Sequence, residues 1–331
     1  MARIVTVAAA QLGPNQKSDT REVIVGRIVR LMEGAHKRGA EVIVFPELAL
    51  TTFFPRWYYE DVEEAESWFE TQLPSAATQP IFDAARRYGL TVHLGFAELA
   101  EEPDESGTVR KRRFNTAVLI SPDGDTILKY RKVHLPGHAE LIPERPMQHL
   151  EKRYFEVGNL GFPVVNAPLG NSERANVGLL ICNDRRWPEA WRELGLQEVE
   201  IVMVGYNTPT DFLDPRTSQS PHLRVLHSNL SVQAGAYQNS CFAVAVAKAG
   251  NEDGFNLFGS SVIVNPLGEI IAQTSTWEDE LIVADCNLEL CKLSRATTFD
   301  FEKHRRIEAY QRITTQTGSS KPPVWQAGEK A

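Results

Sequence analysis

The sequence predicts a single-domain α/β protein, and three observations support this fold class. An apolar strand, an amphipathic helix and a second apolar strand open the chain as a β-α-β unit. Further strands, helices and two hairpin turns follow without a Pro-, Gly- or Ser-rich linker between them. The 331 residues also suffice to bury a large core without disulfides. We therefore expect one domain over residues 1–315 and a polar tail over residues 316–331.

The opening unit is defined by its apolar periodicity. Residues 4–10 are apolar at nearly every position, which is typical of a strand covered on both faces. Asp19 and Glu22 resemble a capping box, and apolar residues then recur at helical spacing. Residues 41–45 form the second strand, which a proline stops. Glu47 therefore follows the carboxyl end of a buried strand, where α/β sheets bind their ligands.

The same patterns predict the remaining elements. Further helices are expected over residues 76–88, 187–195 and 223–237. Further strands are expected over residues 90–98, 114–121, 126–131, 162–166, 176–181, 199–204, 242–247, 260–264, 270–273 and 281–285. Hairpin turn signals occupy residues 122–125 and 266–269. Residues 132–161 lack periodicity, which is typical of a functional segment in a compact domain. The tail is either disordered or an arm on a partner subunit, and Val324 and Trp325 favour the arm.

Composition argues against several classes of protein. The net charge of -8 disfavours nucleic-acid binding, which needs a basic face. Neither a secretory signal pattern nor an apolar run of about 18 residues occurs, so we expect a cytoplasmic protein without membrane partners. The four cysteines are too scattered for a disulfide framework and form no CxxC pair. His134 and His138 have the spacing of a helical metal pair, but Pro136 and Gly137 lie between them. We expect neither a metal nor a cofactor.

A reactive cysteine is expected in residues 178–188. An apolar run ends at Cys182 and a helix begins shortly after it, which places the thiol on a sharp strand-to-helix turn. Such a turn exposes a side chain and presents backbone N–H groups, that of Asn183 first, to whatever the thiol attacks. Arg185 and Arg186 would favour the thiolate and attract an anionic substrate. The alternative is an inert core thiol. That is our expectation for the other three cysteines: Cys241, Cys286 and Cys291.

A cysteine hydrolase also needs a base and a group that stabilises an oxyanion. Glu47 is a candidate base, because a carboxylate at the end of a buried strand holds its proton more tightly than one in water. Lys132 ends a strand in the same way and would place an ammonium against developing negative charge. Glu151 would add a third charged group if residues 132–161 fold over the site. Taken singly, each has a plainer interpretation as a helix cap, a surface lysine or a surface ion pair.

Three motifs together resemble the signature regions of the nitrilase superfamily, whose members carry a Glu-Lys-Cys triad. They occupy residues 45–47, 130–135 and 178–184, in the order that the family has. More narrowly, the chain resembles the N-carbamoyl-D-amino-acid amidohydrolases of that superfamily. The narrower likeness lies in residues 46–57, 134–138, 148–156, 182–189 and 205–210. Residues 139–144 and 211–223 depart from the family pattern and are expected to border the pocket, which leaves side-chain preference open.

The resemblance implies a four-layer α-β-β-α sandwich that packs through one helical layer into homodimers or homotetramers. It implies metal-free hydrolysis of N-carbamoyl-D-amino acids to the D-amino acid, ammonia and carbon dioxide through a cysteine carbamoyl thioester. The implied catalytic residues are the base Glu47, the oxyanion stabiliser Lys132, the nucleophile Cys182 and a second carboxylate, Glu151. The implied substrate-binding residues are Arg185, Arg186, His149, Asn207, Thr208 and Asn183. Two histidines are implied to support the site: His134 and His227.

Other functions remain open on the sequence alone. A related amidase would act by the same chemistry on a carbamoyl amine, a β-ureido acid or a simple amide, although Arg185 and Arg186 favour an acid. A non-catalytic member would bind carboxylated metabolites. A thiol redox protein is disfavoured, because no second cysteine lies near Cys182 in the sequence. Preference for the D-enantiomer follows only from the resemblance.

Overall fold

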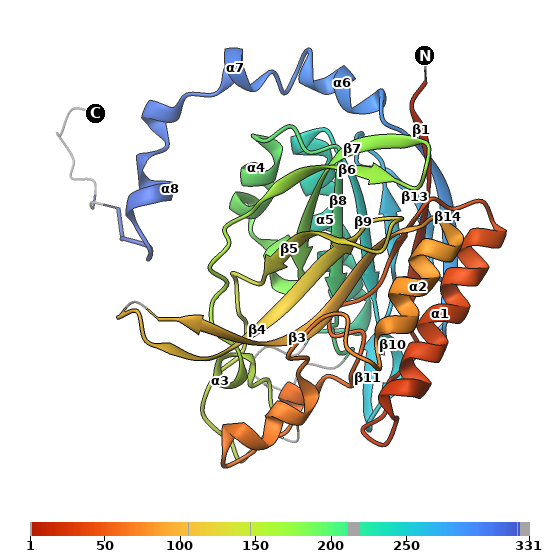
Figure 1. Cartoon of the computed structure of the whole chain (residues 1–331). Coiled ribbons are helices and arrows are strands. Elements are labelled where there is room, and N and C mark those ends of the chain that lie inside the picture. The colour runs from red at the N-terminus through yellow and green to blue at the C-terminus, as the bar shows by residue number, and fades with distance from the viewer. Residues whose placement is uncertain (1, 105, 146, 211–218, 323, 325–331) are drawn as a thin grey trace.

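Two six-stranded mixed sheets stack face to face, and a pair of helices covers the outer face of each sheet (Figure 1). The computed structural model describes residues 2–104, 106–145, 147–210, 219–322 and 324. The expected four-layer α-β-β-α sandwich is therefore confirmed. In the part of the chain that is described, no helix has both the length and the apolar character needed to cross a membrane.

The first sheet has the strand order β14-β1-β2-β3-β4-β5. Its parallel centre consists of β1 (Ile4–Gln11), β2 (Val42–Val44) and β3 (Thr91–Pro103). Its antiparallel flanks are β14 (Glu280–Asn287), β4 (Val109–Ile120) and β5 (Thr126–Arg131). The expected strands were correct in kind, but β3 and β4 extend together beyond their predicted ends into a long charged hairpin.

The second sheet repeats this arrangement, with the order β13-β12-β9-β8-β7-β6. Its parallel centre consists of β7 (Glu173–Ile181), β8 (Ile201–Tyr206) and β9 (Phe242–Ala247). Its antiparallel flanks are β6 (Val164–Leu169), β12 (Val262–Val264) and β13 (Ile270–Gln273). In both sheets, the carboxyl ends of the parallel strands are therefore available for a site.

Successive side chains of a strand point to opposite faces, so the apolar residues of the sheets form two kinds of core: one between the sheets and one under the outer helices. In β1, Val5, Val7 and Ala9 face the other sheet, whereas Ala8 and Ala10 lie under the outer helices. Both faces of this strand are thus buried, as its nearly continuous apolar sequence predicts. Helices α1 (Arg21–Lys37) and α2 (Gln79–Tyr88) cover the first sheet, and α4 (Pro188–Gly195) and α5 (Pro221–Asn239) cover the second.

The start of α1 corrects one expectation. Thr20, and not Asp19, is the N-cap residue, and its hydroxyl accepts a hydrogen bond from the backbone N–H of Val23. Asp19 instead accepts from the backbone N–H of Gln16, one turn earlier. Threonine and aspartate are both good caps, so composition alone does not choose between adjacent candidates.

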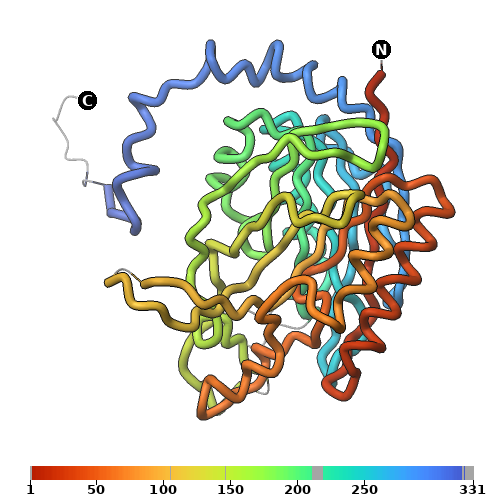
Figure 2. The backbone as a smooth tube through the Cα atoms, in the orientation of Figure 1, coloured from red at the N-terminus to blue at the C-terminus, as the bar shows by residue number. Residues whose placement is uncertain are grey.

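Several short elements were not predicted. They are the hairpin β10 (Ala249–Glu252) and β11 (Phe255–Phe258), the helix α3 (Glu151–Tyr154) and the 3₁₀ turns η1 (Phe54–Arg56), η2 (Val62–Trp68) and η3 (Cys182–Arg186). Beyond β14 the chain continues through α6 (Leu290–Arg295), α7 (Phe301–His304), η5 (Ile307–Ala309) and α8 (Gln311–Thr315). We call residues 290–315 the C-terminal arm, which arches over the outer side of the helices on the second sheet (Figure 2). Val324 in the tail is 84% exposed, whereas Trp325 and residues 211–218 lie outside the described residues.

Two glycines allow the backbone that carries Glu47 to pass between the sheets. A Cβ atom on Gly95, in β3, would lie 2.9 Å from the Cα atom of Glu47. A Cβ atom on Gly205, in β8, would lie 2.6 Å from the backbone nitrogen of Glu47. Contacts this short do not occur with a real side chain, so glycine at both positions permits the approach. Glu47 is thereby fixed at the seam between the two sheets.

His93, a fully buried histidine of β3, lies beside the segment that carries Glu47. Its Nδ1 atom lies 3.0 Å from the carbonyl oxygen of Phe45, and its Nε2 atom has no hydrogen-bond partner among the described residues. Burial lowers the pKa of His93 from 6.5 to about 4. The neutral imidazole therefore contributes stability that is present above pH 6.5 and lost as the pH falls through 4.

We expect this histidine to make the protein acid-sensitive. Between pH 7 and pH 4.5, the free energy of unfolding of the wild type should fall by about 2 to 3 kcal/mol more than that of His93→Asn. Asparagine retains a donor toward the carbonyl oxygen of Phe45 but does not titrate. Urea denaturation at the two pH values measures the difference, and equal losses in both proteins would contradict the assignment.

Candidate active site

Four strand ends meet at the seam between the sheets. Glu47 is the third residue after β2, and Lys132 is the first after β5. Cys182 and Asn207 are the first residues after β7 and β8. Each sheet therefore contributes two residues. The structure thus brings together the three motif residues that are far apart in the sequence.

A buried ammonium lies between two buried carboxylates. The Nζ atom of Lys132 donates to Oε1 of Glu47 at 2.7 Å and to Oε2 of Glu151 at 2.5 Å, and all three side chains are inaccessible to solvent. Burial alone would lower the pKa of Lys132, but the acidic groups Cys182, Glu151 and Glu47 together outweigh burial and raise it above its ordinary value. Burial would raise the pKa of Glu151, but Lys132 and His149 together outweigh burial and lower it. Lys132 is consequently a permanent cation in this site.

Cys182 lies beside this group on a strained turn. Its φ of 49° is in the left-handed region, which residues other than glycine rarely adopt. We expected an exposed thiol, but Cys182 is 6% exposed and lines a cavity. Burial and the charge of Glu47 raise the pKa of Cys182, whereas Lys132 and Arg185 lower it to a smaller extent. The resting sulfur is therefore a thiol that needs a base. The other three cysteines are core residues, as expected.

Asn115 and Asn207 fix the carboxylate of Glu47. Asn115 donates from Nδ2 to Oε1 at 2.8 Å, and the backbone N–H of Asn207 donates to Oε2 at 3.1 Å. The thiol of Cys182 lies 3.5 Å from the carbonyl oxygen of Asn207. Asn207 thus contacts both the carboxylate and the thiol. Asn115 was missed by sequence reasoning, because it lies within β4 and carries no local signal.

The cavity at Cys182 has a volume of about 440 Å³ and a strongly basic lining. Its basic residues are Arg145, Arg186, Arg224, His149 and His227. Among the described residues that line it, none is an aspartate or a glutamate. The charge of Arg185, followed by desolvation, lowers the pKa of Arg186 to about 10, so Arg186 remains cationic at neutral pH. This charge pattern suits an anionic ligand.

Arg185 has a different position from the one expected. It is 1% exposed and does not line the cavity. Its guanidinium donates to the carbonyl oxygen of Cys182 at 2.6 Å and to the hydroxyls of Ser228 and Thr208 at 3.1 and 3.2 Å. It also packs 4.2 Å from the ring centroid of Tyr206. Its fixed contacts therefore support the turn of Cys182 from behind.

The remaining predicted residues surround the same cavity. Asn183, Thr208, His149 and His227 line it, and Nε2 of His149 lies 3.1 Å from Oε1 of Glu151. His134 lies on the other side of the Cys182 turn, where Nδ2 of Asn183 donates to its carbonyl oxygen at 3.1 Å. The structure thus places His134 beside the turn and not in the cavity.

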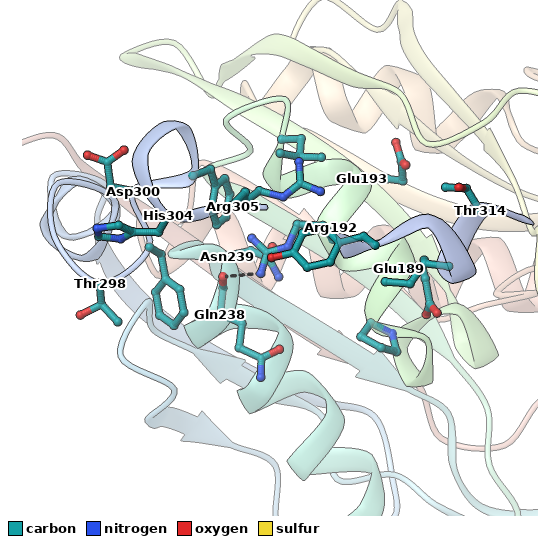
Figure 3. A pocket seen from close by; sticks show the side chains of 16 residues that line it. Glu189, Arg192, Glu193, Gln238, Asn239, Thr298, Asp300, His304, Arg305 and Thr314 are labelled. Atoms are coloured by element: carbon teal, nitrogen blue, oxygen red, sulfur yellow. Dashed lines mark hydrogen bonds between the residues drawn. The ribbon is translucent and has the colours of Figure 1, made fainter. Parts of the chain in front are cut away.

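A second cavity, of about 420 Å³, lies between α4 and the C-terminal arm (Figure 3). It shares no lining residue with the cavity at Cys182. Arg192 and Glu193 from α4 and Arg305 from the arm are among the side chains around it. This second cavity contains no part of the Glu47, Lys132 and Cys182 cluster.

The geometry allows a definite chemistry. Glu47 is near enough to Cys182 for its charge to raise the pKa of the thiol, Lys132 offers a fixed positive charge, and the turn offers backbone N–H groups. An α-β-β-α sandwich with this cluster at its strand ends has the features that the nitrilase superfamily motifs predict. The chain belongs to the carbon-nitrogen hydrolase family, whose sequence pattern matches residues 6–296. It is a hydrolase of non-peptide carbon–nitrogen bonds, so the family-level resemblance is confirmed.

The chain is also similar to several individual proteins. The chain is 29% identical to a nitrilase of Pyrococcus abyssi (strain GE5 / Orsay), over 93% of this chain and 100% of that protein. It is 28% identical to an N-carbamoylputrescine amidase of Solanum lycopersicum, over 96% of this chain and 97% of that protein. The fold matches a crystal structure of a carbon-nitrogen hydrolase from Helicobacter pylori G27, with a TM-score of 0.78, 21% identity and coverage of 95% and 99% of the two chains. These relatives do not single out the N-carbamoyl-D-amino-acid amidohydrolases.

Proposed function

We propose that this protein hydrolyses N-carbamoyl-D-amino acids to D-amino acids, ammonia and carbon dioxide. The observation that carries the proposal is the basic lining of the cavity at Cys182, with no carboxylate among its described lining residues. A guanidinium binds a carboxylate in bidentate geometry, so Arg186 is the proposed partner of the substrate's acid group. The preference for the D-enantiomer rests on the motif resemblance alone.

The proposed reaction has two halves. Glu47 takes the proton of Cys182 while the sulfur bonds to the carbamoyl carbon, and Lys132 and the backbone N–H of Asn183 stabilise the oxyanion. The bond from this carbon to the amino nitrogen then breaks, and Glu47 gives the proton to the departing amine. In the second half, Glu47 takes a proton from water as the hydroxide adds to the thioester carbon. The carbon–sulfur bond breaks, Glu47 returns the proton to the sulfur, and the released carbamate decomposes to ammonia and carbon dioxide.

A second candidate is a carbamoyl-amine amidase, which the similarity to N-carbamoylputrescine amidase supports. Its substrate would bring a cationic chain end to a cavity that Arg186 and other cations line. Repulsion between like charges disfavours that arrangement. The two candidates share the same chemistry at Cys182 and differ in the group that the far part of the cavity binds.

Arg186→Gln separates these candidates. We expect the wild type to hydrolyse N-carbamoyl-D-phenylalanine with a kcat/KM about 100-fold above that for N-carbamoylputrescine, because a charge-assisted contact is replaced by a repulsion. Arg186→Gln should raise the KM for the acid about 10- to 100-fold. Ammonia release measures both values, and the L-enantiomer tests the chiral preference.

The controls isolate the carboxylate. N-carbamoyl-D-phenylalaninamide lacks the acid, so its kinetics should be equal in the wild type and in Arg186→Gln. Arg174→Gln removes an exposed arginine whose partners lie in β6, away from the cavity, and should change neither substrate. Equal or better turnover of N-carbamoylputrescine by the wild type would favour the second candidate.

We also propose a homodimer or homotetramer in the cytoplasm. Exposed apolar side chains on the outer helical layer support self-association: Leu196, Leu226, Leu230 and Tyr237. Burial of such a layer by a second copy is the usual way to remove it from water. We further propose that residues 1–315 form one domain and that the tail, residues 316–331, contacts a partner subunit. Sedimentation velocity of the full chain and of a chain ending at residue 315 tests both proposals.

A further inference from the structure

Asp184, two residues after Cys182, is a fully buried carboxylate with a dense set of partners. Its Oδ2 atom accepts from the hydroxyl of Tyr130 at 2.8 Å and from the backbone N–H of Ile181 at 3.1 Å. Its Oδ1 atom accepts from the backbone N–H of His134 at 2.9 Å. The same atom lies 2.8 Å from Nδ1 of His134, which donates in the tautomer protonated there. Four donors thus converge on one side chain, and we call Asp184 together with its donors on Tyr130, His134 and Ile181 the clamp.

These donors come from the two segments that carry the reactive groups. Tyr130 and His134 each lie two residues from Lys132, on either side of it, and Ile181 is the residue before Cys182. Lys132 follows the first sheet and Cys182 follows the second, so the carboxylate ties the sheets together across the seam. The ring of His134 also stacks on Trp187, at 5.0 Å and 8°. The contacts therefore hold the two strand ends from the side opposite to the cavity.

We propose that Asp184 is a positioning residue that acts through Tyr130, His134 and Ile181 to fix the distance between Lys132 and Cys182. Asp184 is fully buried and accepts hydrogen bonds from Tyr130, Ile181 and His134, so it acts through these residues and not on the substrate. Only a carboxylate of this length offers two oxygens that both accept, because an asparagine turns one donor toward other donors. The inference rests on the proposed roles of Lys132 and Cys182 in hydrolysis.

The protonation state of Tyr130 agrees with this arrangement. Burial, followed by the charge of Asp184, raises the pKa of Tyr130 well above its ordinary value, so its hydroxyl remains a donor. A hydrogen bond between a neutral donor and a buried carboxylate is stronger than one between two neutral groups. The hydrogen bond from Tyr130 to Asp184 is therefore kept at neutral pH.

Asp184→Asn tests the proposal. We expect a folded protein whose kcat for the best ureido substrate falls about 100-fold while KM changes less than about threefold, because a misplacement of about 1 Å has this effect on rate. Glu200→Gln is the matched control, because Glu200, the residue before β8, is another buried carboxylate. It accepts hydrogen bonds from Arg3 and from the backbone N–H of Asn176 in β7. Glu200→Gln should leave kcat unchanged. Wild-type kcat in Asp184→Asn overturns the proposal.

A double-mutant cycle separates positioning from general loss of stability. Tyr130→Phe removes one hydroxyl from the clamp and should lower kcat about 10-fold, again without a matching change in KM. Because both substitutions break the same clamp, the double variant should be no slower than Asp184→Asn. Effects that multiply overturn the proposal. If Asp184→Asn does not fold, Tyr130→Phe decides alone, and unchanged kcat in that variant overturns it.

A readout on the thiol distinguishes this inference from the proposed function. Lys132 lowers the pKa of Cys182, so looser placement of the ammonium should move alkylation of Cys182 by iodoacetamide to higher pH in Asp184→Asn. Peptide mapping identifies the alkylated cysteine. A wild type that releases no ammonia from any ureido or amide substrate refutes the proposed function while the alkylation shift still tests the clamp. An unshifted alkylation profile overturns the clamp whatever the substrate.

Discussion

Cys182→Ala should abolish hydrolysis, with a loss of about 10⁴- to 10⁶-fold in kcat. The proposed reaction passes through a covalent bond to this sulfur, which follows β7. Among the described residues that line the cavity, no other side chain is a comparable nucleophile. The remaining groups can bind the substrate and polarise its carbonyl, so weak residual hydrolysis is compatible with the mechanism.

Ammonia release at saturating substrate measures the loss, and mass spectrometry of the quenched wild type should detect a mass increase of one carbamoyl group on the peptide of Cys182. Cys241→Ala is the matched control, because Cys241 is a core thiol that lies outside the cavity. It should retain full activity. Turnover of Cys182→Ala at the wild-type rate would remove the thiol from the mechanism.

Glu47→Gln should lower kcat about 10³-fold with little change in KM, because Glu47 transfers protons in both halves of the proposed reaction. Glutamine keeps the size of the side chain and one carbonyl oxygen toward Lys132 and Asn115. It cannot accept a proton. The loss should therefore appear in the chemical steps and not in substrate binding.

The same variant should make the thiol more reactive. The charge of Glu47 raises the pKa of Cys182, so its removal lowers this pKa and moves alkylation by iodoacetamide to lower pH. Faster alkylation combined with slower turnover is the expected pattern, because a base is lost while the thiolate becomes easier to form. A parallel fall of both rates would indicate a displaced Cys182 and would contradict the role of Glu47 as the base.

Much of the fold was predictable because local signals agree with it. The strand over residues 126–131 follows the hairpin turn signal of residues 122–125, and the structure has the same strand bounds. Pro188 begins α4, as its fixed φ favours. The hairpin β10–β11 was missed because its residues pair across a charged turn and lack alternation. The C-terminal arm was missed because its α-helices have only four to six residues, and α7 and α8 contain no buried residue that would give an apolar periodicity.

The site was predictable where function imposes a sequence motif and not where tertiary contacts decide. Glu47, Lys132 and Cys182 each follow a strand and are brought together as the motifs imply. Arg185 was expected in the pocket because it is adjacent to Arg186, but successive residues of a 3₁₀ turn point in different directions, and Arg185 points inward. Asn115 carries no sequence signal, and Asp184 lies within the motif over residues 178–184 but receives a role only from the partners that the fold supplies.

The division of the reactive groups between two sheets has a consequence for how the enzyme fails. Glu47 and Lys132 follow strands of one sheet and Cys182 follows a strand of the other. The apolar layer between the sheets, Asn207 and Asp184 hold these groups at fixed distances. A small increase in the distance between the two sheets would separate these groups and abolish activity while every helix and strand stayed intact. Shelf life and heat tolerance should therefore depend on the inter-sheet layer more than on the outer helices, and substitutions that fill that layer are the place to lengthen them.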